Sequence, residues 1–181
     1  VSAFLLNRSS DLAIMWRESN PKIVSLWYDV DRTAKAAIIN RTTTETHGIQ
    51  FECKSGMLFI TLPSGRMLSY VKPQIGINKY GSESITYEGI DGTKHWTRLE
   101  TFGGKLVENI IQAISRDILC NSMKTLSAYN ICAHVHDEVI IECPMAESVN
   151  YICKQMAIPP SWANGLLLRA DGYESMFYKK D

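Results

Sequence analysis

The sequence predicts an α+β fold in which an antiparallel sheet is backed by helices. Three patterns lead to this prediction: apolar residues recur at helical spacings before residue 41, they alternate with polar residues between positions 51 and 90, and a second long helical pattern follows from residue 105. No repeat or low-complexity segment interrupts this order. A chain of 181 residues that is 45% hydrophobic is expected to form one domain, or one and a half.

Two helices are expected at the start of the chain. Ser9 or Ser10 can cap the first helix, and Asn20 can cap the second, which then has Pro21 in its first position. Apolar residues at spacings of three and four continue to Asn40, where we expect the second helix to end.

A region of strands is expected next. Between Phe51 and Ile77 the alternating pattern is broken by Pro-Ser-Gly, which predicts a hairpin with its turn near Ser64 and Gly65. Strand signals continue through residues 84–90, and Gly103 with the glycine after it ends the strand region.

The segment 105–126 is predicted to be a long helix with two different faces. Its apolar side carries Val107, Ile110, Ile111, Ile114 and Ile118. A polar stripe at helical spacings consists of Lys105, Glu108, Asn109, Gln112 and Arg116. Such a stripe is usually a solvated helix face, and a binding surface is the alternative interpretation.

The stretch "ICAHVHDEVIIEC", residues 131–143, is predicted to be a second hairpin. Tight turns usually recruit Gly, Asn or Pro, and residues 136–139 contain none of these, so local turn preference did not select them. If Asp137 and Glu138 form a two-residue turn, His136 lies opposite Val139 and Cys132 lies opposite Cys143. Residues 145–157 are then expected to form a short covering helix, and residues 166–173 a last strand.

Two acids at a rigid hairpin tip are suitable ligands for a hard cation. Mg²⁺ prefers oxygen ligands and is commonly held by one or two carboxylates together with substrate phosphates. A hairpin that presents Asp137 is therefore expected to form half of a Mg²⁺ site.

Charge and cysteine usage limit the classes of function. Nineteen basic and nineteen acidic residues give a net charge of zero, so any contact with nucleic acid must come from a local patch. Five cysteines without a C-x-x-C pair argue against a disulfide framework and a zinc ribbon, and favour a reducing, cytoplasmic location. No apolar run is long enough for a membrane span, and the opening at Val1 reads like the interior of a longer polypeptide.

Four stretches in order resemble family A DNA polymerases, the relatives of bacterial DNA polymerase I. "VHDEVIIE" resembles the carboxy-terminal catalytic motif of the family, and "TLPSGRMLSY" resembles its T-L-x-G-R hairpin. "NPKIVSLW" is similar to the helix before that hairpin, and "GGKLVENIIQAISRDIL" to the phage-type version of the Gln-bearing palm helix. The resemblance covers nearly all of the chain.

The resemblance implies a palm-type sheet with a catalytic hairpin, in which residues 1–62 are the C-terminal part of the fingers and residues 63–181 the C-terminal part of the palm. It implies DNA-directed DNA polymerase activity in DNA replication, which is nucleotidyl transfer by a two-metal mechanism with two Mg²⁺ ions in the complete enzyme. The expected partners are primer–template DNA, a dNTP and the missing N-terminal part of the same polypeptide.

The resemblance also assigns roles to individual residues. Asp137 is expected to bind catalytic metal and Glu138 to support the site. The expected DNA contacts are His136, Gln112 and Asn109 in the minor groove, and Arg66 and Lys105 on phosphates. The first carboxylate motif of the family and its Lys and Tyr-Gly fingers helix are not found in the sequence, so the chain by itself is expected to be inactive.

Two other classes of function stay open. The spacing of His134, His136 and Asp137 is also compatible with a stand-alone metal-dependent hydrolase. The third possibility is a non-catalytic nucleic-acid-binding module.

Overall fold

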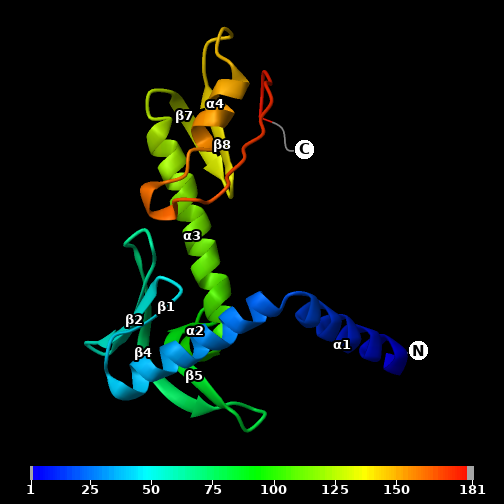
Figure 1. Ribbon diagram of the computed structural model, residues 1–181, viewed down its shortest axis with the longest axis vertical. Helices are drawn as coiled ribbons and strands as arrows, with labels where there is room; N and C mark the ends of the chain where they lie inside the picture. The colour runs from blue at the N-terminus through cyan, green and yellow to red at the C-terminus, as the bar shows by residue number, and fades with distance from the viewer. Residues whose placement is uncertain (1, 179–181) are drawn as a thin grey trace. The chain divides into compact units, whose positions relative to one another are not determined.

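The computed structural model describes residues 2–178, with side chains described from residue 11 onward. The fold is α+β, as expected, and the paired strands of the described residues are antiparallel (Figure 1). The chain divides into two compact units, Val1–Ile110 and Ile111–Asp181, which are described separately. This division does not test the predicted fingers–palm boundary at residues 62 and 63, which stays a prediction.

The first unit opens with helices α1 (Ser2–Ser19) and α2 (Pro21–Asn40). The predicted bounds of α2 are confirmed, although the Asn20 side chain donates to the carbonyl of Trp16 at 2.8 Å rather than capping α2. The predicted start of α1 at Ser9 or Ser10 is wrong. Both serines lie inside a helix that begins earlier, where their backbone donors already have helical partners.

Six strands form a meander in the order of the sequence. They are β1 (Thr44–Thr46), β2 (Ile49–Lys54), β3 (Met57–Thr61), β4 (Met67–Ile77), β5 (Glu83–Ile90) and β6 (Trp96–Thr101). The turn predicted near Ser64 and Gly65 is confirmed between β3 and β4: Gly65 has φ 83°, and its N–H donates to the Leu62 carbonyl at 2.8 Å. Positive φ explains the glycine at this position.

One face of this sheet makes the core of the first unit. Side chains alternate along β2, so that Ile49, Phe51 and Cys53 are buried while Gln50 and Lys54 are exposed. Helix α2 packs on the sheet (Figure 1) and contributes the buried residues Val30, Ala34, Ala37 and Ile38.

Helix α3 (Gly103–Thr125) starts against α2. The Gly103 N–H donates to Asp31 Oδ1 at 2.9 Å, and a Cβ at position 103 would collide with the carbonyl oxygen of Trp27. Leu106, Val107 and Ile110 are buried, whereas Ile111, predicted on the same apolar side, is 51% exposed, so this side of the helix is not buried along its whole length.

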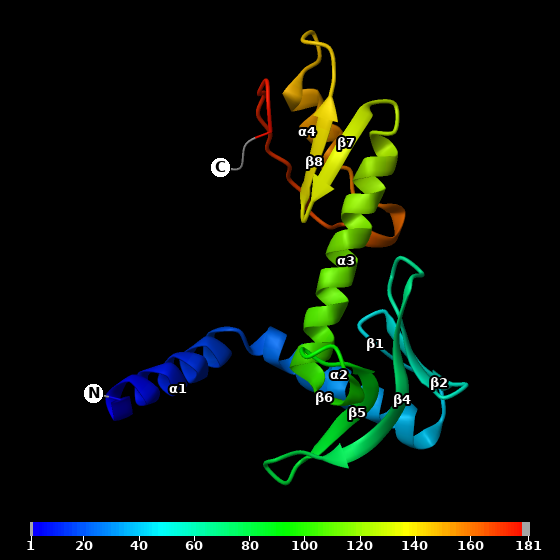
Figure 2. The ribbon, with the colours of Figure 1, turned by 180° about the vertical axis from the view of Figure 1, so that it is seen from behind.

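The second unit contains the rest of α3, strands β7 (Asn130–Val135) and β8 (Glu138–Glu142), helix α4 (Val149–Met156) and a 3₁₀ turn at Ser161–Ala163 (Figure 2). The covering helix expected within residues 145–157 is confirmed as α4. The hairpin of β7 and β8 forms a sheet of its own, separate from the six-stranded sheet. Ser122 on α3 is 4% exposed, and its Oγ lies 3.0 Å from the carbonyl oxygen of Met156 on α4.

The strand predicted over residues 166–173 is wrong. These residues have no regular secondary structure, and Leu167 is 96% exposed. Three consecutive leucines do not alternate, and a strand needs a neighbouring strand for its backbone hydrogen bonds. In the described chain this segment pairs with none.

Within residues 2–178, no helix combines the length and the apolar character that crossing a membrane would require.

Candidate functional site

Of the two acids that the sequence singled out, Asp137 lies in the turn between β7 and β8, and Glu138 is the first residue of β8. The turn consists of His136 and Asp137, with Val135 paired to Glu138. The expectation of a turn at Asp137 and Glu138, with His136 opposite Val139, is therefore wrong by one residue. The predicted pairing of Cys132 with Cys143 is also wrong, because Cys132 is the unpaired residue of a bulge between Ile131 and Ala133, and Cys143 lies beyond the end of β8.

The backbone of His136 explains this turn. Its φ is 52°, in the left-handed region where glycine is favoured and where His, Asn and Asp are the most frequent other residues. A tight turn without glycine thus forms because a histidine adopts positive φ. The prediction that local turn preference did not select these residues stays a prediction.

The side chains of the turn face solvent. His136, Asp137 and Glu138 are all exposed, which agrees with the expectation that Asp137 does not lie in the core. Val135 and Ile140, on the two strands behind the turn, are only half-buried. A two-stranded sheet with neither strand covered on both faces leaves part of each apolar side chain accessible.

Glu138 has a partner that the sequence did not reveal. The Tyr178 hydroxyl donates to Glu138 Oε2 at 3.3 Å. Desolvation and the nearby Glu138 charge raise the pKa of Tyr178, so the hydroxyl stays protonated and remains a donor at neutral pH. The two residues are 40 positions apart, and no local pattern of spacing or composition links them.

The polar stripe of α3 is confirmed as an exposed surface. Its members are all exposed: Lys105, Glu108, Asn109, Gln112 and Arg116. Gln112 belongs to the same compact unit as the hairpin, whereas Lys105 and Asn109 belong to the first unit.

Two further candidates for DNA contact lie in the first unit. Arg66 is exposed in the turn between β3 and β4, and Lys105 is exposed in the first turn of α3. Asn109 donates through Nδ2 to the hydroxyl of Tyr70 at 2.9 Å, a contact that the sequence did not predict. Their predicted contacts with DNA, like those of His136 and Gln112, stay predictions.

The donor chemistry at the turn suits a hard cation. Asp137 offers carboxylate oxygens at an exposed tip, which is the ligand type that Mg²⁺ prefers. No group of three or more His, Cys, Asp or Glu side chains that could hold a metal occurs within the described part of the chain. His134, His136 and Asp137 therefore do not assemble the three-ligand site of the hydrolase interpretation.

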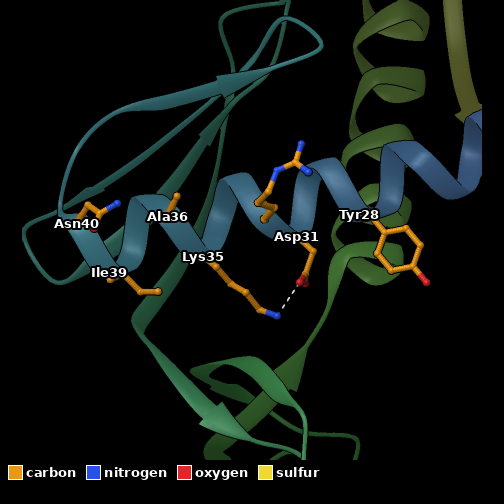
Figure 3. A pocket seen from close by; sticks show the side chains of 7 residues that line it. Tyr28, Asp31, Lys35, Ala36, Ile39 and Asn40 are labelled. Carbon is orange, nitrogen blue, oxygen red and sulfur yellow. Dashed lines mark ion pairs between the residues drawn. The ribbon is translucent and has the colours of Figure 1, made fainter.

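A separate surface depression of about 590 Å³ lies along α2 in the first unit (Figure 3). It is lined by Tyr28, Asp31, Arg32, Lys35, Ala36, Ile39 and Asn40. Lys35 Nζ lies 2.6 Å from Asp31 Oδ2 and donates to the carbonyl of Glu83 at 3.0 Å. The ammonium group of Lys35 thus joins α2 to the start of β5. None of the predicted site residues lines this depression.

Comparison with known proteins gives one informative result. The chain is 43% identical over 176 residues to a DNA polymerase of Bacillus phage SP02. The matched region is 94% of this chain and 27% of that polymerase, so the chain spans about a quarter of the relative's length. No protein-family model and no solved structure matches the chain. The chain is thus similar, over nearly all of its length, to one portion of a phage DNA polymerase.

Proposed function

We propose that this chain is the C-terminal fingers-and-palm portion of a family A DNA-directed DNA polymerase. The observation that carries the proposal is 43% identity, over 94% of the chain, to a phage protein named DNA polymerase. The order of the polymerase-like stretches and the exposed His-Asp-Glu hairpin support it further. The proposed reaction is template-directed nucleotidyl transfer, with primer–template DNA and a dNTP as substrates.

In this proposal the β7–β8 turn supplies one carboxylate of the catalytic centre. Asp137 would hold Mg²⁺, and Glu138, held by Tyr178, would support the charge balance beside it. A bound Mg²⁺ pair supplies stabilisation of negative charge on the reacting phosphate. The strands behind the turn fix the position of the Asp137 carboxylate, so that little reorganisation is needed at the moment of reaction.

The exposed amide and imidazole groups have a role in the same proposal. Every base pair presents acceptors in the minor groove, so donors from Gln112, Asn109 and His136 can contact correctly paired DNA without reading its sequence. Arg66 and Lys105 would contact phosphates and position the duplex.

A hybrid polymerase tests this proposal directly. The matched segment of the phage SP02 polymerase is replaced by this chain, and primer extension is measured with Mg²⁺ and four dNTPs. We expect extension by the hybrid. The 181-residue chain, assayed in parallel, is expected to show none, since the other ligands of a two-metal site are expected elsewhere in the polypeptide.

Folding of the hybrid is checked by its cooperative thermal transition. A hybrid that melts cooperatively and binds primer–template, yet extends no primer, would contradict the proposal. Extension by the 181-residue chain alone, free of contaminating polymerase, would contradict its assignment as an incomplete portion.

A further inference from the structure

Tyr70, on β4, has the properties of a fixed anchor. The residue is 6% exposed, and its ring meets the ring of Tyr87 edge to face, with centroids 4.9 Å apart and planes at 87°. Edge-to-face pairs of this kind are favourable and restrict the movement of both rings. The hydroxyl of Tyr70 is therefore held in one place by the packing of the sheet.

That hydroxyl contacts a side chain on the exposed stripe of α3. Asn109 Nδ2 donates to the Tyr70 oxygen at 2.9 Å, and Asn109 is otherwise exposed to solvent. Burial is the main cause that raises the pKa of Tyr70, so the hydroxyl remains protonated well above neutral pH. A protonated phenol can accept from the amide nitrogen or donate to the amide oxygen.

The contact with Tyr70 leaves part of the Asn109 amide available to a second partner. An asparagine side chain has two donors and an acceptor oxygen, which is more than one hydroxyl can satisfy. Contact with Tyr70 on one side directs the rest of the amide away from the sheet. With one N–H of Nδ2 donating to Tyr70, the second N–H of the same nitrogen remains, and it can donate to a minor-groove acceptor.

We infer that Tyr70 is a positioning residue, whose buried hydroxyl holds the Asn109 amide in the orientation that meets the base edges of a bound DNA duplex. Fixing the amide before binding reduces the rotamer entropy that association would otherwise cost. The inference rests on the proposed function and adds to it a residue that does not itself touch DNA.

The test measures the dissociation constant of the complete polymerase polypeptide, or of the phage SP02 hybrid, for a primer–template duplex. Tyr70→Phe removes the hydroxyl and keeps the ring, and Asn109→Ala removes the amide. We expect each change to weaken DNA binding by about threefold to tenfold, the effect of one neutral hydrogen bond. Because both changes remove the same contact, the double variant should bind no more weakly than Asn109→Ala.

Tyr87→Phe is the matched control, since it removes a hydroxyl from the neighbouring ring. It should leave the dissociation constant within about twofold of the unchanged protein, inside the usual effect of a substitution away from the contact. Thermal unfolding of all variants shows whether a change in DNA binding follows a loss of folded protein.

Three results would overturn the inference. In the first, Tyr70→Phe binds DNA normally while Asn109→Ala binds it weakly. In the second, the losses of DNA affinity caused by the two changes multiply in the double variant. In the third, Asn109→Ala has no effect on DNA binding in a polymerase that extends primers. In each case the proposed function stands. Failure of the unchanged polypeptide to bind primer–template at all would overturn both.

Discussion

His136 contributes to the hairpin through both its backbone and its side chain. Its backbone takes the positive φ that closes the hairpin, and its imidazole is exposed next to Asp137 in the chain. Left-handed backbone costs a non-glycine residue about 1 kcal/mol, which the pairing of β7 with β8 offsets. A glycine would form this turn more easily but would supply no side chain.

Asp137 is the residue whose substitution tests the proposed metal site most directly. In the SP02 hybrid, Asp137→Asn keeps the shape of the side chain and removes its charge, so we expect kcat to fall by about 10²-fold or more. DNA binding should be largely unchanged, and Glu138→Gln should lower kcat less. Asp171→Asn, at another exposed aspartate of the second unit, is the control. Near-normal primer extension by Asp137→Asn would exclude the metal-binding role.

The lowered pKa of Glu88 predicts that the stability of the fold depends on pH. Hydrogen bonds from Lys72 and then Trp96, with the charge of Arg98, hold the pKa of Glu88 below its usual range. A depressed pKa in the folded state stabilises the fold above the unfolded-state pKa, and this contribution is lost as pH falls through the folded pKa.

Glu88→Gln should therefore lower the free energy of unfolding at pH 7 and lower it less at acidic pH, where the carboxyl of folded Glu88 takes up its proton. Urea unfolding across this range measures the effect, with Glu52→Gln as a control on the same sheet. An equal loss at both pH values would show that the carboxylate charge is not the cause.

At the scale of elements, the start of α3 depends on one glycine. Gly103 brings the backbone of α3 against the Trp27 carbonyl of α2, and its N–H is held by Asp31. Backbone atoms cannot move aside as the end of a flexible side chain can, so an added methyl group must displace one helix.

Gly103→Ala should lower the free energy of unfolding by about 1–3 kcal/mol, the usual cost of overpacking. Gly92→Ala is the matched control, because a Cβ at position 92 would have no neighbour within 4 Å. Urea denaturation of the 181-residue chain compares the two variants. Equal stability of both would mean that α2 and α3 separate at little cost.

The elements that the sequence predicted well carry their signals locally. Pro21 and the apolar spacing after it define α2, and Pro-Ser-Gly defines the turn between β3 and β4. The hairpin at residues 130–142 was predicted, but its turn was misplaced by one residue, because positive φ at His136 is invisible in a pattern of apolar residues.

The rest depends on contacts between distant parts of the chain. A strand at residues 166–173 needs a neighbouring strand, which local alternation cannot supply. The contacts of Tyr70 with Asn109 and of Tyr178 with Glu138 join residues 39 and 40 positions apart. The exposed polar stripe was predicted from periodicity, whereas the buried hydroxyl that holds one of its members was not.

At the scale of the whole molecule, a net charge of zero limits the attraction for DNA. We expect the 181-residue chain to bind primer–template weakly and to lose affinity as salt rises, because the proposed contacts of Arg66 and Lys105 are with phosphates. Fluorescence anisotropy measures this dependence of DNA affinity at salt concentrations from about 50 to about 200 mM, the range over which such contacts weaken. Tight binding that persists in high salt would contradict it.

The division between the compact units at Ile110 and Ile111 falls in the interior of α3, which has consequences for splitting the protein into fragments. Two polypeptides separated there would each end in an interrupted helix, with about four backbone donors or four acceptors deprived of partners at the break. A complementation pair would be better divided between β4 and β5, where Tyr80 is 79% exposed and the chain already turns. The boundary between the two compact units is thus a poor place to divide this polypeptide, because it falls inside a helix. An exposed turn between two strands is a better one.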